Sequence, residues 1–356
     1  MALPKFAHVS QGFHTDLKRR IADYFSATGE KPTGNYKLYT KAIILTVSYV
    51  AMFTHLVFFD PSVAVAVVEC VILGMSTAFI GFNIMHDGAH GSFSTSPAVN
   101  KLAAVSLNIL GGSSFMWNIK HNIIHHAYTN VDGVDDDIDA GILLRMAKTQ
   151  RRLKLHRFQH VYFWVLYAVL YIYWIFVSDY RKYFSGRIGS MPLKKMSFAD
   201  HFSFWGYKLL HIALFIALPI YMHGFTEWLV GFIIFSTVAG FILSIVFQLA
   251  HTVEHTAFPM PDTDTGKMAD EWAIHQIKTT ANFATGNPVV SWLVGGLNFQ
   301  VEHHLFPKVS HIHYPRLNKI VKETCKEYGV DYIEYPTVGK AIRSHINYLK
   351  EMGKAA

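Results

Sequence analysis

Nine of the 21 histidines fall into four short clusters whose spacing suits metal binding. Each cluster holds residues three, four or five positions apart, which places their side chains one turn apart on one face of a helix. Neutral imidazole is the commonest side-chain metal ligand in proteins. The clusters are His86 with His90, His121 with His125 and His126, His251 with His255, and Gln300 with His303 and His304. Together they predict a metal site built from several helices.

The number of imidazoles indicates more than one metal ion. Nine ligands exceed the three or four of a single zinc, and an all-nitrogen set suits zinc, copper, nickel or iron. Two metal ions that share the set are the simplest division. A competing interpretation is a zinc protease, because residues 251–255 read HTVEH and offer Glu254 as a general base. That interpretation leaves seven of the histidines unexplained.

The composition indicates that these clusters belong to a membrane protein. The chain of 356 residues is 51% hydrophobic and 15% aromatic but only 16% charged, which is too apolar for an ordinary soluble domain. Its formal net charge is +7, yet no Lys or Arg occurs between Lys41 and Lys101 or between Lys208 and Lys267. Each gap is long enough for two membrane spans. The basic residues flank apolar stretches, so nothing indicates nucleic-acid binding.

The apolar stretches predict an all-α integral membrane protein with four transmembrane helices in two hairpins. The predicted spans are 42–59 with 63–82, and 209–225 with 228–250. A fifth stretch, 161–177, has basic flanks at both ends, which the positive-inside rule places in the cytoplasm. We expect it to be an interfacial or re-entrant helix. All four clusters then lie on the cytoplasmic side, in a helical cap that holds a histidine-rich dimetal site.

We expect one membrane domain over residues 1–356. Its predicted parts are a cytoplasmic segment 1–40, a first hairpin 42–82, a cytoplasmic segment 83–207 with the first two clusters, a second hairpin 208–250, and a cytoplasmic segment 251–356. A metal transporter would carry its histidines within the spans. Here the clusters follow span ends and share one side, which argues against transport.

The sequences HDGAH, HNIIHH and QVEHH, in this order around the predicted hairpins, resemble the three histidine boxes of membrane fatty acid desaturases. Further stretches support the resemblance: WNIKHN near Trp117, TNVDGVDDD near Asn130, HQIKTTANF from His275 and HIHYP from His311. Within this family, the chain resembles most the front-end subgroup (delta-6 or delta-5 type), whose last histidine box begins with Gln, here Gln300. The fold and activity of that family are therefore expected.

The resemblance implies a non-haem diiron centre that uses O2 to introduce a cis double bond into a long acyl chain. It implies these ligands: His86, His90, His121, His125, His126, His303 and His304. A further helix of the family supplies one more histidine and, one turn earlier, a residue that holds a water at the metal, which His255 and His251 match. We infer that His251 also binds metal and offsets the weaker Gln300.

Acidic residues are expected to orient the rings, because neutral imidazoles leave the charge of two iron ions largely uncompensated. The candidates are Asp87, Glu254 and Glu302, inside or beside the clusters. The acidic run DGVDDDID, residues 132–139, lacks the spacing of a calcium loop and is expected to be a solvated turn.

The remaining expectations concern partners and substrate. The sequence contains no HPGG haem-binding motif, so a separate electron donor, ferredoxin or cytochrome b5, is implied. The substrate would be an acyl-CoA or an acyl lipid, with delta-6 as the expected position. The location would be the bacterial inner membrane or the endoplasmic reticulum, with the active site facing the cytoplasm. The alternative activity is that of a diiron membrane hydroxylase acting on alkyl or carotenoid substrates, which would leave oxygen in its product.

Overall fold

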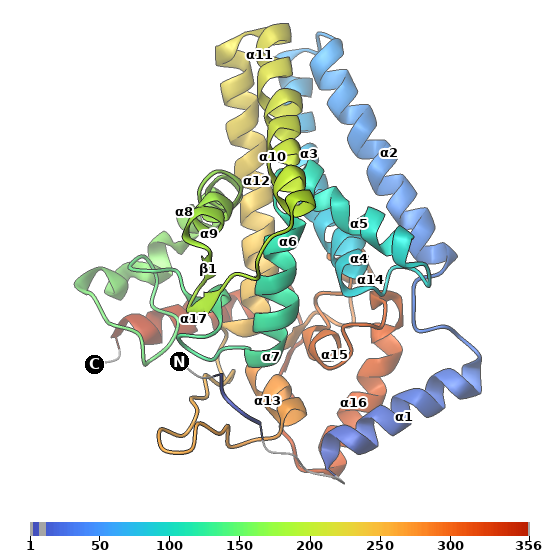
Figure 1. Ribbon diagram of the computed structural model, residues 1–356, viewed down its shortest axis with the longest axis vertical. Coiled ribbons are helices and arrows are strands. Elements are labelled where there is room, and N and C mark those ends of the chain that lie inside the picture. The colour runs from blue at the N-terminus through green and yellow to red at the C-terminus, as the bar shows by residue number, and fades with distance from the viewer. Residues whose placement is uncertain (1–2, 7–11, 355–356) are drawn as a thin grey trace.

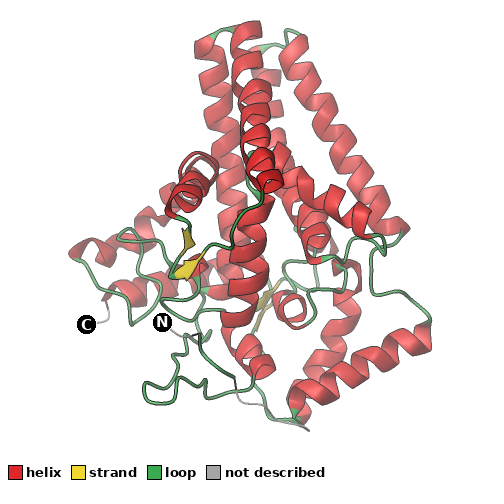
Figure 2. Cartoon of the chain, in the orientation of Figure 1, coloured by secondary structure: helices red, strands yellow, loops and turns green. Residues whose placement is uncertain are grey.

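Nearly all regular structure in the protein is helical (Figures 1 and 2). The computed structural model describes residues 3–6 and 12–354, so part of the predicted segment 1–40 lies outside the described residues. The strands in the described chain form an antiparallel and a parallel pair. They are β1 (Arg187–Ile188) with β2 (Met191–Pro192), and β3 (Asn282–Phe283) with β4 (Glu334–Tyr335). The predicted all-α class is confirmed.

Long apolar helices pack against one another and form the bundle in the upper part of Figure 1. They are α2 (Tyr36–Phe58), α3 (Val63–Ile80), the run of α10 (Phe198–Ile212), η6 (Ala213–Ala217) and α11 (Leu218–His223), and α12 (Phe225–His251). The side chain of Asn35 caps α2 by accepting a hydrogen bond from the backbone of Lys37. Gly224, with φ of 87°, makes the tight turn between α11 and α12.

By length and composition, five helical runs of the described chain could cross a membrane. Four of them overlap the predicted spans, although one begins at Phe198 rather than Leu209. The fifth, Lys154–Ser185, contains the stretch 161–177. In Figure 1 its helices α8 (Gln159–Tyr173) and α9 (Asp179–Ser185) run across the bundle rather than along it. This direction favours an interfacial helix, and the number of four spans stays a prediction.

Wide, π-helical turns continue several of these helices towards the histidines. Helix α3 passes without a break through η1 (Gly81–Met85) into α4 (His86–His90). The second histidine cluster lies in η2 (Asn118–His125), which follows α6 (Ser114–Trp117) and leads into α7 (His126–Tyr128). Because a π-turn joins residues five apart, His126 returns to the face of His121. The five-residue spacing in the sequence therefore becomes a contact.

The remaining helices surround the lower end of the bundle or connect its members (Figure 1). They are α1 (Phe13–Thr28), α5 (Pro97–Ile109), η3 (Asp136–Ile138), η4 (Lys154–Phe158), η5 (Trp174–Ser178), α13 (Trp272–Thr279), α14 (Pro288–Leu293), α15 (Gln300–Leu305), η7 (His311–His313), α16 (Tyr314–Glu327) and α17 (Val338–Lys354). Helices α5 and α6–α7 form a pair bent by 112°. Phe13 and Leu17 of α1 pack into a buried cluster with residues of α13, α15 and α16.

Helix α12 is the centre of the bundle because glycines let its neighbours approach closely. A Cβ atom at Gly240 would lie 2.6 Å from the backbone oxygen of Ala168 in α8. A Cβ atom at Gly74 of α3 would lie 2.5 Å from the backbone oxygen of Phe235 in α12. Backbone atoms cannot move aside as a flexible side chain can, so the hydrogen of glycine is required at both crossings. The position of α12 matters because its last residue is His251.

We predict that Gly240→Ala destabilises the protein by about 1–3 kcal/mol, because the added methyl group overpacks the crossing of α8 and α12. Gly206→Ala in α10 is the matched control, since nothing lies within 4 Å of a Cβ atom there. This control should be neutral or stabilising by up to ~1 kcal/mol through helix propensity. Thermal unfolding of both variants in detergent measures the difference, and equal melting temperatures would contradict the close-packed crossing.

Candidate metal centre

Eight of the nine predicted histidines converge on one place. Ring centroids from different segments are 4.4 Å apart for His86 and His303, 4.5 Å for His126 and His304, and 4.7 Å for His125 and His251. Four separate pieces of chain supply them. His86 and His90 come from α4, His121, His125 and His126 from η2 and α7, His251 from the end of α12, and His303 and His304 from α15. All eight are buried except His90, which is partly exposed.

The candidate ligand atoms form two adjacent groups, with one further histidine between them. Each group has its nitrogens within 4.8 Å of one another. The first group contains His86, His90, His121 and His303, and the second contains His125, His251 and His304. His126 forms a further group with His303 and His304, so it stands between the two. The arrangement provides nitrogen donors for two neighbouring metal ions.

Several ring nitrogens of these histidines are buried without a hydrogen-bond partner in the described chain, as expected of atoms that bind metal ions. Six ring nitrogens are buried without a hydrogen-bond partner among the described residues: His90 Nε2, His125 Nε2, His126 Nδ1, His251 Nε2, His303 Nε2 and His304 Nε2. Leaving a polar atom buried and unpaired costs about 1–3 kcal/mol each. Coordination to a metal ion would satisfy nitrogens of this kind, and imidazole nitrogen is a suitable donor for iron.

Hydrogen bonds to the opposite ring nitrogens orient several of the donors. His125 Nδ1 lies 3.0 Å from Asp135 Oδ2, and His303 Nδ1 lies 3.1 Å from the hydroxyl of Tyr314. His304 Nδ1 lies 2.8 Å from Gln276 Oε1. A partner on Nδ1 fixes the ring and directs Nε2 towards the metal. Each of these three rings has its unpartnered Nε2 on the side of the cluster.

Asp135 corrects the prediction that residues 132–139 form a solvated turn. The residue is 2% exposed, and besides contacting His125 its carboxylate accepts a hydrogen bond from the backbone of Asn130 at 2.9 Å. Asp137 of the same run belongs to a group with His121 and His125. Sequence reasoning took the run for a surface feature because its charge density is high. The signal that could have identified it is its place inside TNVDGVDDD, one of the stretches that carried the resemblance.

Gln276 and Tyr314 were also missed, although they lie inside two of the quoted stretches, HQIKTTANF and HIHYP. The amide oxygen of Gln276 accepts from the Thr129 hydroxyl at 2.8 Å as well as facing His304. A single sequence gives no distance between residue 276 and residue 304, so their pairing depends on the packing of α13 against α15.

His255 does not join the cluster, contrary to the prediction that it binds metal. Its side chain is exposed, its backbone has φ of 77°, and it belongs to none of the metal-competent groups. The reason is that α12 ends at His251, so the four-residue spacing no longer follows a helix. His251, which was also predicted to bind metal, belongs to a group with His125 and His304 that could hold a metal ion.

The predicted acidic partners contact other groups, not the eight histidines. Asp87 Oδ2 accepts from Ser310 at 2.7 Å and faces His311 Nδ1 at 3.0 Å. Glu302 accepts hydrogen bonds from Asn282, Asn318 and Tyr332. Glu254 is partly exposed, and its carboxylate lies 3.5 Å from the side-chain amide of Asn347. These carboxylates support the surrounding structure rather than the rings.

Gln300 lies on the helical face that carries His303 and His304, three and four residues later. Its amide oxygen is buried and has no hydrogen-bond partner among the described residues. This geometry keeps Gln300 a candidate for a weak ligand or for a contact to a metal-bound water.

Burial keeps the imidazoles of α15 neutral and therefore available as donors. Desolvation and the neighbouring His86 lower the pKa of His303 well below its ordinary value. Desolvation and the neighbouring His126 do the same for the pKa of His304. Burial also raises the pKa of Glu302, although the hydrogen bonds from its three partners oppose the rise. A protonated imidazole could not donate its electron pair to a metal, so the site is electrostatically prepared for cations.

Known proteins resemble this chain over nearly its whole length. The family model described as "Fatty acid desaturase" matches residues 61–336. The sn-1 linoleoyl-lipid 6-desaturase of Synechocystis sp. is 37% identical over 97% of this chain and 97% of that protein. The enzyme of the same name from Arthrospira platensis is 35% identical over 96% of this chain and 93% of that protein. The acyl-lipid (8-3)-desaturase of Physcomitrium patens is 36% identical over 97% of this chain and 72% of that protein.

We predict that Asp135→Asn lowers metal affinity by roughly 10–100-fold, because the His125 ring loses its charged hydrogen-bond partner. Competition against a chelator, followed by elemental analysis, measures the loss. Asp139→Asn is the control, since Asp139 belongs to the same acidic run but is exposed. An equal loss of metal affinity in both variants would show that the total charge of the acidic run strengthens metal binding, and that the contact between Asp135 and His125 does not.

A second comparison separates two residues of the HTVEH stretch. His251→Ala removes a buried donor and should reduce the metal content of the purified protein, whereas His255→Ala should leave it unchanged. Elemental analysis per chain gives the result, and the thermal stability of each variant shows whether it is folded. A loss of metal in His255→Ala would contradict the placement of that residue outside the centre.

Proposed function

The chain belongs to the fatty acid desaturase family, and from this premise we propose that it is a front-end, delta-6 acyl-lipid desaturase with a diiron centre held by histidines. It is a membrane oxidoreductase, and its apolar helices make it a multi-pass protein. The observation that carries the proposal is the pair of adjacent nitrogen groups with His126 between them. One such group alone would suit a single zinc ion; two together match a two-metal oxidase.

The proposed ligand sets follow the two groups of nitrogens. His86, His90, His121 and His303 would hold one iron ion, and His125, His251 and His304 the other. His126 is available to either, and His255 is not part of the set. When bound, the iron ions supply the reduction of O2 that removes two hydrogen atoms from an unactivated acyl chain. Side chains alone cannot attack such a bond, because it has no acidity that a general base could use.

The residues around the ligands hold the site in place while this chemistry proceeds. Asp135, Tyr314 and Gln276 fix three of the rings through their Nδ1 atoms. Burial of seven of the eight histidines keeps bulk water away from the reacting chain. The overall balance is that O2 becomes two waters with four electrons, two from the acyl chain and two from an external donor. The donor is proposed to be a separate ferredoxin or cytochrome b5.

The delta-6 position is proposed from two lines of support. Gln300 begins the last histidine box, as the resemblance to front-end desaturases requires. The relatives from Synechocystis sp. and Arthrospira platensis carry the name sn-1 linoleoyl-lipid 6-desaturase. We further propose that the metal centre faces the cytoplasm, because the basic loops of the chain flank it on that side.

We predict that a host fed linoleate and expressing this chain accumulates a triene with a new cis double bond at carbon 6. Gas chromatography with mass spectrometry of its fatty acids gives the position of the bond. His125→Ala should abolish the triene, while His255→Ala should retain it at the level of the wild type. A hydroxylated product from the wild type would instead support the alternative of a membrane hydroxylase.

A further inference from the structure

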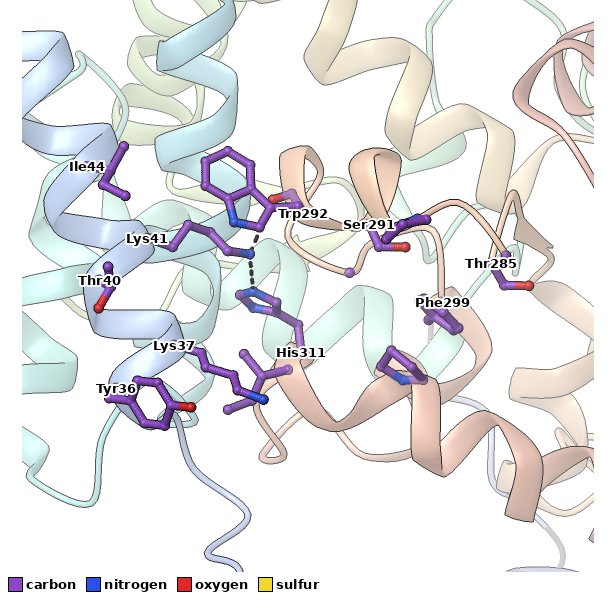
Figure 3. A pocket seen from close by; sticks show the side chains of 15 residues that line it. Tyr36, Lys37, Thr40, Lys41, Ile44, Thr285, Ser291, Trp292, Phe299 and His311 are labelled. Atoms are coloured by element: carbon purple, nitrogen blue, oxygen red, sulfur yellow. Dashed lines mark hydrogen bonds between the residues drawn. The ribbon is translucent and has the colours of Figure 1, made fainter.

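A cavity of about 650 Å³ lies between the beginning of α2 and the segment 285–315. This volume is within the range of small-molecule sites in proteins. Figure 3 shows the side chains of Lys37 and Lys41 extending from α2 towards that segment, with Trp292 and His311 on the opposite wall. The cavity is distinct from the histidine cluster, because none of the eight clustered histidines lines it.

The lining combines positive charge with hydroxyl groups and apolar surface. Lys37 and Lys41 supply the charge, and among the described residues that line the cavity none is acidic. Hydroxyls come from Tyr36, Thr40, Thr285 and Ser291. Apolar surface comes from Ile44, Pro288, Trp292, Phe299, Ile312 and Pro315. A ligand that matches this lining carries a negative charge, hydrogen-bonding groups and an apolar part.

The two lysines have different roles. Lys41 is 6% exposed, and its ammonium lies 2.7 Å from Asn83 Oδ1, 3.2 Å from the backbone oxygen of Trp292 and 3.0 Å from His311 Nε2. These contacts occupy its donors, so Lys41 contributes a fixed positive charge to the cavity wall. Lys37 is exposed, and its ammonium has no partner among the described residues. Lys37 is therefore free to bind an anion.

The wall of this cavity is joined to the metal centre. His311, whose Nε2 faces Lys41, presents its Nδ1 to Asp87 Oδ2 at 3.0 Å, and Asp87 is adjacent to His86 in α4. Asn83, which accepts from Lys41, donates to the backbone oxygen of Leu293 at 2.8 Å. On the other side, Phe299 immediately precedes α15. The cavity thus lies directly beside the segments that carry four of the ligands.

We propose that this cavity binds the anionic head group of a glycerolipid whose acyl chain is the substrate, with Lys37 as the cation that contacts its phosphate. The assignment rests on the proposed delta-6 desaturation. A double bond placed near the carboxyl end of the chain requires the head group to be held close to the metal centre. The cavity meets that requirement, because His311 in its wall contacts Asp87, the residue next to His86.

A lipid fits better than a coenzyme A thioester for two reasons. The first turns of α2 are also the beginning of an apolar helix whose Ile43, Ile44 and Val47 are exposed, so the cavity opens beside a lipid-facing surface. Coenzyme A carries several phosphate groups, whereas the cavity offers one free ammonium. A head group with a single phosphate charge matches that number.

Lipid binding to the iron-loaded, full-length protein tests the proposal without measuring catalysis. Four probes with the same linoleoyl chains are compared in detergent by native mass spectrometry: phosphatidylglycerol, phosphatidylcholine, a monogalactosyl lipid and linoleoyl-CoA. We expect phosphatidylglycerol to be retained best. Lys37→Glu should lower its occupancy about tenfold, because charge reversal replaces an attraction by a repulsion. Lys37→Arg should preserve it.

Lys195→Glu is the matched control. Lys195 is an exposed lysine shortly before another apolar helix, α10, and does not line the cavity. Equal occupancy of all the lipids, an equal loss in Lys195→Glu, or Lys37-dependent retention of linoleoyl-CoA in place of the lipid would overturn the proposal. Retention of phosphatidylglycerol that depends on Lys37, in a wild type that forms no double bond, would support the head-group site and contradict the delta-6 activity instead.

Discussion

The constraint on which this structure depends is the burial of many imidazoles in one place. Six ring nitrogens of the clustered histidines are buried and have no hydrogen-bond partner in the described part of the chain. A protein without metal would have to bear that cost, and protonation cannot relieve it because the rings lie beside one another. Cations bound between the rings convert the same arrangement into a favourable one. Folding of this region and metal binding are therefore expected to be coupled.

The apolar bundle matters chiefly because it fixes where the ligand-bearing segments end. Helix α3 continues through a π-turn into α4 and delivers His86 and His90 as one rigid extension. Helix α12, held by the close contact of Gly240 with α8, ends at His251. The same helix end that presents His251 turns the chain away before His255. Helix length, rather than the number of histidines, decides which of them can coordinate.

Two sets of hydrogen bonds surround the metal centre and serve different purposes. Asp135, Gln276 and Tyr314 contact rings of the histidine cluster directly and set their orientation. The chain from Lys41 through His311 to Asp87 contacts no ligand ring, but it connects the wall of the cavity to the helix of His86. A buried lysine at the beginning of a membrane helix is costly unless it has such partners. Its position joins the proposed head-group site to the proposed metal centre.

Spacing and composition alone predict the helical class, the long apolar helices and the eight histidines that meet in the cluster. These features depend on local spacing and composition, which a single sequence contains. The roles of Asp135 and Gln276 and the exclusion of His255 were decided by tertiary structure. Asp135 looked like a solvated acid because its burial beside His125 follows from the fold of a loop. His255 looked like a ligand because the spacing rule assumes a helix, and only the packing of α12 determines where that helix stops.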